Sequence, residues 1–368
     1  MRNTESIVKN ICFFSCDYQM GGANVVALNI ANEFVSRYNV HLVSALDRMD
    51  ATPDERIRYT SFSLSEKRVL RMHLDCAFKF KKFIEDNDID VVFAIGYYSA
   101  FFIAPFFYKR GKCRFVFCEH GAPANQLSDK KATIMRRALV RCYDMTVALT
   151  ERSARDFVDI IGAKPDKVRY IYNWIDEKNI DDSISYDLSS KKLLTVGRMT
   201  SEKGFDMLCD IARDVFSRHP DWEWHIMGDG PCRSSLEQKI AEYSLERNVV
   251  LHGAVSDAQR YFGEYAIMTL TSYREGLPLV LLEAKAKKLP CISFDVVTGP
   301  SEIIRNSVNG YLIPIYDKEA FADKLCDLIE NEELRHSFSE CAYLDIDKFK
   351  KEKILGEWIA LTESLILR

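Results

Sequence analysis

Short apolar segments recur along the chain, and each is followed by a turn and then by residues with helical spacing. Strands that alternate with helices in this way pack as parallel sheets with helices on both faces. We therefore predict an α/β fold built on doubly wound sheets, with ligands bound at the carboxyl ends of the strands. The expected strands are Ile7–Ser15, Val40–Leu46, Val91–Ile95, Phe115–Cys118, Met145–Leu149, Val168–Tyr172, Lys192–Val196, Trp222–Met227, Val249–His252, Ala266–Leu270, Cys291–Phe294 and Asn309–Ile313.

Two domains are expected from the length. The chain has 368 residues, more than one hydrophobic core usually serves, and its 47% hydrophobic content is enough for two cores. Glu177–Ser190 is polar and poor in core residues, which is typical of a linker. The predicted boundaries are 1–175 for the first domain, 176–190 for the linker, 191–349 for the second domain and 350–368 for a terminal helix.

Charge and cysteine content narrow the class of protein. Residues 1–175 hold 26 Lys and Arg against 20 Asp and Glu, whereas the remainder holds 24 against 34. A basic half beside an acidic half indicates that one face meets an anionic partner, such as membrane phosphate. The 11 cysteines include no CxxC pair, so we interpret them as reduced thiols of a cytosolic protein. Neither a membrane span nor an export signal is expected.

One stretch, SYREGLPLVLLEA, predicts a loop that turns into a buried helix. Pro278 suits the first helical position, where its missing N–H costs nothing. The amides of Gly276 and Leu277 would face an anion at the positive end of the helix. A diphosphate bound there would have Glu275 on one side and Glu283 on the other. A buried helix with two incidental acids is the alternative explanation.

The two glutamates, in the form Glu275-Gly-Leu-Pro and Glu283-Ala, resemble the signature of the family-4 retaining glycosyltransferases. The resemblance implies the GT-B fold, in which two Rossmann-like domains face each other across a cleft. It implies an acceptor-side N-terminal domain, to which the helix at 350–368 returns, and a C-terminal domain that binds the nucleotide sugar. The match is strong in residues 192–313 and weak in residues 1–170, which favours a shared donor and a divergent acceptor.

The same resemblance suggests the site residues. Arg198 and Lys203, in Gly-Arg…Glu-Lys-Gly, are expected to bind the diphosphate, for which a planar guanidinium and a mobile ammonium are suited. His120, in Glu-His-Gly at the end of a strand, is expected to contact the donor sugar beside Glu275. These four residues are the predicted catalytic group. The predicted donor contacts are Gly21, Gly22, Asn173, Gly228, Val255, Gly276, Leu277 and Glu283.

The implied reaction transfers a hexose (Gal, GalNAc, Glc or GlcNAc) from a UDP-sugar to a lipid-linked or growing glycan acceptor. It would serve the synthesis of a capsule, an O-antigen or a lipopolysaccharide. Retention would come from attack on the same face, with the leaving phosphate taking the acceptor proton, so no cofactor and no metal are expected. Asp88 and Asp90 form an Asp-x-Asp pattern, which we interpret as the start of a buried strand and not as a metal site.

Basic residues stand beside large apolar residues in the segments 66–85 and 97–107, and four more basic residues follow the second segment. This combination is typical of a surface that rests on anionic lipid. We therefore predict a cytoplasmic protein that is peripheral to the inner face of the plasma membrane. Core aromatics beside a solvated charged face are the alternative, and nucleic acid is not expected as a partner because no binding motif accompanies the charges. The residues concerned are Lys67, Arg68, Leu70, Arg71, Leu74, Phe78, Lys79, Phe80, Lys81, Lys82, Phe83, Tyr97, Tyr98, Phe101, Phe102, Phe106, Phe107, Lys109, Arg110, Lys112 and Arg114.

Three other functions remain open. A nucleotide-sugar epimerase shares the fold but would act without an acceptor. A starch- or sucrose-type synthase fits the modest length and the basic, aromatic N-terminal half less well. A sugar-binding or scaffold protein without enzyme activity would have no need to keep Arg198, Lys203, Glu275 and Glu283 together.

Overall fold

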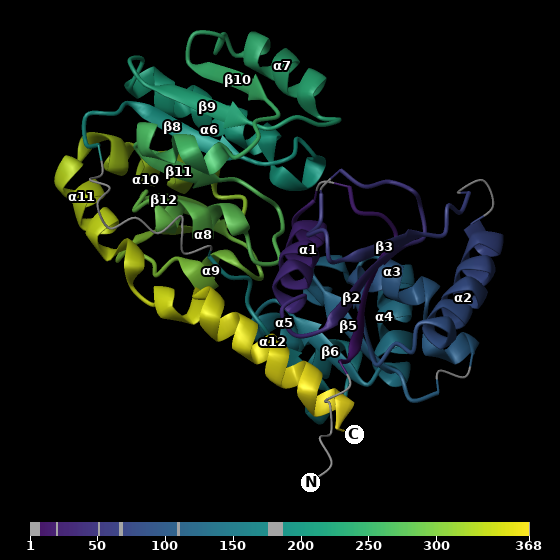
Figure 1. The fold of residues 1–368 in the computed structure, drawn as a ribbon. Coiled ribbons are helices and arrows are strands. Elements are labelled where there is room, and N and C mark those ends of the chain that lie inside the picture. Colours follow the sequence, from purple (N-terminus) through teal and green to yellow (C-terminus); the bar gives the residue numbers. More distant parts are fainter. Residues whose placement is uncertain are drawn as a thin grey trace. The chain divides into compact units, whose positions relative to one another are not determined.

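The structure, a computed structural model, describes residues 8–19, 21–50, 52–65, 69–108, 111–175 and 187–367. It divides into two compact units (Figure 1): unit 1 is Met1–Asn173 with Glu352–Arg368, and unit 2 is Trp174–Lys351. Most of the predicted linker lies outside the described residues. So do Lys67, Arg68, Lys109 and Arg110, and the side chains of Leu70 and Arg71, which were predicted to contact a membrane.

Unit 1 contains, among the described residues, a sheet of seven parallel strands in the order β3-β2-β1-β4-β5-β6-β7. The order reverses between β1 and β4, so these strands flank the switch point of the sheet. The strands are β1 (Asn10–Ser15), β2 (Asn39–Ser44), β3 (Arg58–Ser61), β4 (Val91–Ile95), β5 (Arg114–Glu119), β6 (Met145–Ala148) and β7 (Val168–Tyr170).

Helices cover both faces of this sheet. On one face, Phe80, Phe102 and Leu139 share a core with the strand residues Phe14 and Phe117. These three side chains come from α2, α3 and α4, which therefore form one helix layer. The helices of unit 1 are α1 (Gly22–Phe34), α2 (Val69–Asp86), α3 (Gly96–Phe102), η1 (Pro105–Phe107), η2 (Pro123–Gln126), α4 (Lys130–Cys142), α5 (Glu151–Asp156), η3 (Phe157–Ile161), η4 (Pro165–Lys167) and α12 (Lys351–Ile366).

The opposite face of the same sheet is covered by α1 and α12. The ring of Phe34 lies 5.8 Å from that of Phe13, and the ring of Trp358 lies 5.6 Å from that of Phe93. The C-terminal helix therefore packs as part of unit 1, although it follows unit 2 in the sequence.

Unit 2 contains, within the described residues, six parallel strands in the order β10-β9-β8-β11-β12-β13. The strands are β8 (Lys192–Val196), β9 (Glu223–Met227), β10 (Val249–Gly253), β11 (Ile267–Leu270), β12 (Cys291–Asp295) and β13 (Gly310–Pro314). The helices are η6 (Ser201–Lys203), α6 (Phe205–Arg218), α7 (Arg233–Glu242), η7 (Ala258–Glu264), α8 (Leu279–Ala286), α9 (Pro300–Ile303), α10 (Lys318–Glu330), α11 (Glu332–Glu340), η8 (Cys341–Tyr343) and η9 (Ile346–Phe349).

The prediction of two doubly wound parallel sheets is confirmed. One detail is wrong: α8 begins at Leu279, because Pro278 has an extended ψ of 108° and is the N-cap. Asp90 accepts a hydrogen bond from the amide of Asn10 and pairs with Lys9, at the start of β4. No helix in the described part of the chain is long and apolar enough to cross a membrane.

Candidate functional site

The order of strands in unit 2 reverses between β8 and β11, because the chain runs outward from β8 to β9 and β10 and then crosses to β11. Ligands of open parallel sheets bind at the carboxyl ends of the strands, at such a switch point. The loop 197–204 follows β8 and the loop 271–278 follows β11. The sheet therefore places the predicted residues of both loops at the same edge.

Lys203 and Glu275 form an ion pair between these loops, with Nζ 2.7 Å from Oε1. The hydroxyl of Ser272 donates to the same carboxylate oxygen at 2.6 Å. The side chain of Glu275 is 8% exposed and that of Lys203 is 28% exposed, so the carboxylate is enclosed while the ammonium still reaches solvent. Because a partly buried, hydrogen-bonded pair is held more firmly than a surface pair, it fixes a cation at the switch point.

Close backbone contacts hold the loops around this pair. The hydroxyl of Thr271 donates to the carbonyl oxygen of Lys203 at 3.2 Å. Gly204 has φ +64°, and a Cβ there would lie 2.1 Å from the carbonyl oxygen of Thr271. Gly228 has φ +153°, and its Cβ would lie 1.9 Å from the carbonyl oxygen of Gly197. Only glycine fits either position, so Gly228, predicted as a donor contact, has a packing requirement of its own.

Glu283 lies on α8 and is mostly enclosed. Burial raises the pKa of its carboxyl group. Within the described part of the chain, no side chain or backbone group forms a hydrogen bond or ion pair with this carboxylate. A mostly buried carboxylate without donors costs free energy, which the hydroxyl groups of a ligand could offset.

The turn that precedes α8 is tied to the loop after β12, because the hydroxyl of Thr298 donates to the carbonyl oxygen of Glu275 at 2.7 Å. In this turn Gly276 is half-buried and Leu277 is buried. Arg198 is exposed in the loop after β8, and no carboxylate among the described residues pairs with it. The carboxyl edge of the sheet thus carries the predicted diphosphate contacts on two neighbouring loops.

Three other predicted donor contacts, Val255, Gly228 and Asn173, lie elsewhere in the chain. Val255 is half-buried after β10, the edge strand two places from β8. The amide of Gly228 donates to the carbonyl oxygen of Gly253 at 2.7 Å, which joins the ends of β9 and β10. Asn173 is buried but belongs to unit 1. Its role as a donor contact stays a prediction.

In unit 1, the predicted contacts lie at the carboxyl edge of the other sheet. Gly21 is the N-cap of α1 and Gly22 is its first residue, and the hydroxyl of Ser15 at the end of β1 donates to Oδ1 of Asn24 at 3.0 Å. His120 follows β5, which β4 separates from β1. The N-terminus of α1 and the imidazole of His120 therefore follow β1 and β5, two strands that are not adjacent in the sheet.

The sequence interpretation missed a buried ion pair beside His120. Nε of Arg136 lies 2.7 Å from Oε2 of Glu119, and the two side chains are 1% and 4% exposed. Oε1 of Glu119 accepts a hydrogen bond from the amide of Gly121 at 3.1 Å. The guanidinium lies 4.3 Å from the ring centroid of Tyr97. Glu119 and Gly121 flank His120, so this pair fixes the backbone that carries the imidazole.

A signal for Arg136 was present in the sequence. It stands on the buried side of α4, with Ala132 four positions before it and Leu139 three positions after it. A cation on the apolar side of an amphipathic helix requires a buried partner. Only the fold identifies that partner as Glu119.

We expect His120 to stay neutral between about pH 5 and pH 8, because burial lowers its pKa to about 4. The unfolded chain takes up this proton near pH 6.5, so His120 makes stability fall as the pH decreases from about 6.5 to 4. NMR titration of the histidine ring protons checks this. A midpoint near 6.5 for His120 would contradict the prediction.

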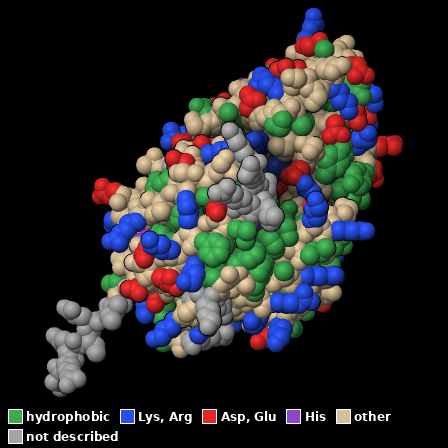
Figure 2. Space-filling view, turned by 90° about the vertical axis from the view of Figure 1, so that its right-hand side faces the viewer, with side chains coloured by type: hydrophobic (Ala, Val, Ile, Leu, Met, Phe, Trp, Pro, Cys, Tyr) green, Lys and Arg blue, Asp and Glu red, His purple; other side chains and the backbone are tan. Residues whose placement is uncertain are grey.

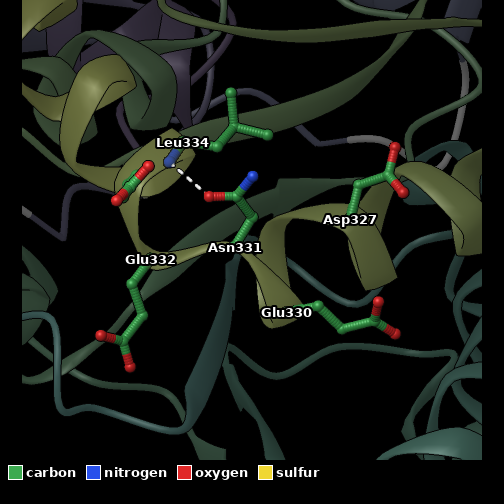
Figure 3. A pocket seen from close by; sticks show the side chains of 6 residues that line it. Asp327, Glu330, Asn331, Glu332 and Leu334 are labelled. Atoms are coloured by element: carbon green, nitrogen blue, oxygen red, sulfur yellow. Dashed lines mark hydrogen bonds between the residues drawn. The ribbon is translucent and has the colours of Figure 1, made fainter.

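An acidic hollow lies elsewhere on unit 2, between α10 and α11 (Figure 3). It is lined by Asp327, Glu330, Asn331, Glu332, Glu333 and Leu334. Asn331 accepts a hydrogen bond from the amide of Leu334 and so caps α11. Four carboxylates would repel a diphosphate, so this hollow is not the donor site.

Two family models together cover nearly all of the chain. Residues 20–179 match the model described as glycosyltransferase family 4, and residues 176–345 match the one described as glycosyl transferases group 1. The amylovoran biosynthesis glycosyltransferase AmsD of Erwinia amylovora is 30% identical over 254 residues, which are 68% of this chain and 70% of that relative. The chain belongs to glycosyltransferase family 4.

Two other relatives match over most of their length. The lipopolysaccharide 1,6-galactosyltransferase of Escherichia coli K12 is 27% identical over 314 residues, 83% of this chain and 84% of that one. The N-acetylgalactosamine-N,N'-diacetylbacillosaminyl-diphospho-undecaprenol 4-alpha-N-acetylgalactosaminyltransferase of Campylobacter jejuni is 24% identical over 348 residues, 91% and 94% of the two chains. By their names, the first relative is a lipopolysaccharide galactosyltransferase and the second transfers N-acetylgalactosamine to a diphospho-undecaprenol-linked acceptor.

Solved structures of other proteins show the same fold. Staphylococcus aureus TarM, in a complex that contains UDP, superposes with a TM-score of 0.81 at 17% identity, over 96% of this chain and 100% of that chain. Anabaena HepE, in a complex with UDP and glucose, superposes with a TM-score of 0.80 at 18% identity, over 96% and 99%. The prediction of a GT-B glycosyltransferase is confirmed.

Proposed function

We propose that this family-4 glycosyltransferase moves a hexose from a UDP-sugar to a lipid-linked or growing glycan, with retention, in cell-surface polysaccharide synthesis. The observation that carries the proposal is the pairing of Lys203 with Glu275 at the switch point of unit 2. Glu283, a mostly buried carboxylate without a partner among the described residues, follows on the next helix. A nucleotide diphosphate supplies an anion for the exposed Arg198 and hydroxyl donors for Glu283.

Each residue then has a role in the reaction. Lys203 and Arg198 neutralise the charge that grows on the leaving diphosphate, and the amides of Gly276 and Leu277 add to this effect. Such electrostatic stabilisation acts on the transition state and is often the largest contribution to catalysis. Glu275 is positioned by Lys203 and Ser272 to hold the hydroxyls of the donor sugar.

The remaining predicted contacts complete the donor site. Glu283 accepts hydrogen bonds from the ribose hydroxyls, and Gly228 and Val255 line the base. His120, neutral at physiological pH, donates or accepts a hydrogen bond to the donor sugar. Gly21, Gly22 and Asn173 add backbone and amide contacts from unit 1.

Retention requires that the acceptor oxygen attack the anomeric carbon from the face that the diphosphate leaves. The bond from that carbon to the phosphate oxygen breaks, the bond to the acceptor oxygen forms, and the acceptor proton passes to the leaving phosphate. No metal is required in this scheme, because Lys203 and Arg198 supply the positive charge. Turnover that persists in EDTA would support this part of the proposal.

The proposed acceptor is linked to a polyprenyl diphosphate, and the proposed location is the inner face of the plasma membrane. A relative that matches over 91% of this chain has a diphospho-undecaprenol-linked acceptor in its name. The basic N-terminal half, with 26 Lys and Arg against 20 Asp and Glu in residues 1–175, is compatible with an anionic surface.

Release of UDP tests the proposed function. The purified protein is incubated with UDP-Gal, UDP-GalNAc, UDP-Glc or UDP-GlcNAc, with and without a polyprenyl-diphosphate-linked saccharide. We expect UDP to appear with one sugar and only when the acceptor is present. Conversion of the UDP-sugar without an acceptor would identify an epimerase, and binding without any conversion would identify a scaffold protein.

Glu283→Gln is expected to weaken UDP binding by about 10–100-fold, the range for loss of hydrogen bonds to a charged group. It is also expected to raise the melting temperature of the ligand-free protein at pH 7. Because burial raises the pKa of Glu283, ionisation of its carboxyl group lowers the stability of the folded protein at pH 7. This loss of stability disappears as the pH falls toward about 4.3, the pKa of a glutamate in the unfolded chain. Thermal melts with and without UDP measure both effects.

The matched control is the exposed Glu246→Gln on unit 2, which should change neither quantity. Unchanged UDP affinity in Glu283→Gln would remove Glu283 from the donor site.

A further inference from the structure

Exposed apolar side chains are concentrated on unit 1. Of the 13 large hydrophobic residues that are exposed in the described chain, six lie between residues 74 and 134. A soluble monomer rarely gathers such residues on one side without a function. They are Leu74 (46% exposed), Phe78 (66%), Tyr98 (44%), Phe106 (49%), Leu127 (47%) and Ile134 (65%).

Five of these residues lie on the helix layer formed by α2, α3 with η1, and α4, and Leu127 lies between η2 and α4. The inner sides of the three helices share a single core against the sheet. On α2, Phe80 and Phe83 fill that core, while Leu74 and Phe78 stand four residues apart on the outer side. Because one apolar stripe suffices to pack a helix, the outer residues are not needed for folding. We call this outer surface the α2–α4 face.

The three helices are neighbours in this layer. The ring of His73 on α2 lies 6.0 Å from that of Tyr98 and 5.6 Å from that of Phe101 on α3. The guanidinium of Arg136 on α4 lies 4.3 Å from the ring centroid of Tyr97 on α3. Figure 2, seen from the side of α2, shows hydrophobic side chains gathered there with Lys and Arg around them.

The charge of α4 indicates what this face contacts. Its 13 residues, KKATIMRRALVRC, contain five Lys and Arg and no Asp or Glu. Arg136 is used in the buried pair, whereas Lys130, Lys131, Arg137 and Arg141 are exposed. Ile134 follows Lys130 by four positions and precedes Arg137 by three, so these side chains share one side of the helix.

On α2 the charge is more balanced than on α4. Its outer side carries Lys81 and Lys82, and Lys81 pairs with Glu85 at 2.8 Å. The attraction to an anionic surface therefore comes mainly from α4, while α2 contributes apolar area through Leu74 and Phe78. An exposed isoleucine within a basic helix is typical of an element that lies at the surface of an anionic bilayer.

We propose that the α2–α4 face docks on an anionic lipid bilayer. Phe78 and Ile134 insert at the level of the headgroups, and Lys130, Arg137 and Arg141 contact the lipid phosphates. This proposal rests on the proposed function, because docking on a membrane would bring the protein to a lipid-linked acceptor. Its test needs neither donor nor acceptor, so the two proposals can fail separately.

The test is co-sedimentation of the full chain with vesicles of phosphatidylcholine alone or mixed with phosphatidylglycerol. We expect binding to the mixed vesicles that weakens with salt. Each Lys or Arg near such a surface contributes roughly fivefold, so the triple variant Lys130→Gln/Arg137→Gln/Arg141→Gln should bind roughly 100-fold more weakly. Phe78→Ser/Ile134→Ser should also weaken binding, because it removes the inserted apolar area.

A matched triple variant on unit 2, Lys191→Gln/Arg213→Gln/Arg247→Gln, removes the same charge from exposed positions and should bind like the wild type. Thermal melts verify that every variant is folded. Equal binding of the wild type to both kinds of vesicle would overturn the proposal, as would equal loss in the two triple variants.

A protein partner is tested in the same set of variants. If Phe78→Ser/Ile134→Ser converts a dimer to a monomer in size-exclusion chromatography and leaves vesicle binding unchanged, a second copy of the chain covers the face. That result would also overturn the lipid proposal. Transfer to an acceptor in detergent, measured without vesicles, should stay at the wild-type rate in all these variants.

Discussion

Lys203→Ala is expected to lower kcat/KM for UDP-sugar transfer by about 10²–10³-fold, the range for loss of one positioned electrostatic contact. Nζ of Lys203 lies 2.7 Å from Glu275, at the switch point where the diphosphate is proposed to bind. Its removal takes away a charge that stabilises the leaving group. It also leaves the Glu275 carboxylate, which is 8% exposed, without its cation. Steady-state release of UDP measures the effect.

Two variants control this experiment. Lys203→Arg keeps the charge and should retain more activity than Lys203→Ala. Lys191→Ala removes a lysine that pairs with Asp221 at 2.6 Å and directly precedes the amino end of β8, so its activity should equal that of the wild type. A kcat/KM for Lys203→Ala within threefold of the wild-type value would contradict the proposed role.

Arg136→Met is expected to lower the free energy of unfolding by about 3–5 kcal/mol, the range for breaking a buried ion pair from one side. The variant leaves the Glu119 carboxylate buried without a cation, since the two side chains are 4% and 1% exposed in the wild type. It should also lower kcat at temperatures where the protein stays folded, because Glu119 fixes the backbone next to His120 through the amide of Gly121. Urea denaturation measures the stability.

The matched control is Arg137→Met, one position along α4, where the side chain is exposed and donates to the carbonyl oxygen of Ile160 at 3.3 Å. It should change the free energy of unfolding by less than about 0.5 kcal/mol. Glu119→Leu/Arg136→Met removes both charges and should recover part of the stability. Equal stability of Arg136→Met and Arg137→Met would show that the buried pair does not contribute as expected.

The strands were predictable where both faces of the sheet are covered. Val91–Ile95 and Lys192–Val196 were predicted at both ends, because a parallel strand between two helix layers is almost entirely apolar. Arg58–Ser61, which forms β3, was missed. It is an edge strand whose four residues include no buried side chain, so no apolar run marks it.

The residues of the site were predictable from the sequence, but the ion pair between Lys203 and Glu275 was not. Motifs placed Lys203 and Glu275 after two different strands, with separate roles at the diphosphate and the sugar. Their ion pair joins residues 72 positions apart in the sequence. It exists because β8 and β11 are neighbours in the sheet, and sheet order is not encoded in either local segment.

For the aromatic segments too, the sequence identified the residues but did not show which of them are buried. Phe78 and Phe80 are two positions apart in one basic stretch, and the sequence interpretation treated both as part of a membrane-contacting surface. Phe80 is fully buried and Phe78 is 66% exposed, so that interpretation is wrong for Phe80. Phe83 and Phe102 are likewise core residues.

Local patterns in the sequence identified most of the strands, the loops that carry charged residues and glycines, and the family whose motifs those loops match. These properties follow from local spacing, because a buried strand and a helix differ in their apolar period. The tertiary structure alone decided that Lys203 meets Glu275, that Arg136 meets Glu119, and that Phe78 faces outward. Such contacts depend on which elements lie side by side, and burial is a property of the neighbours of a residue as much as of the residue itself.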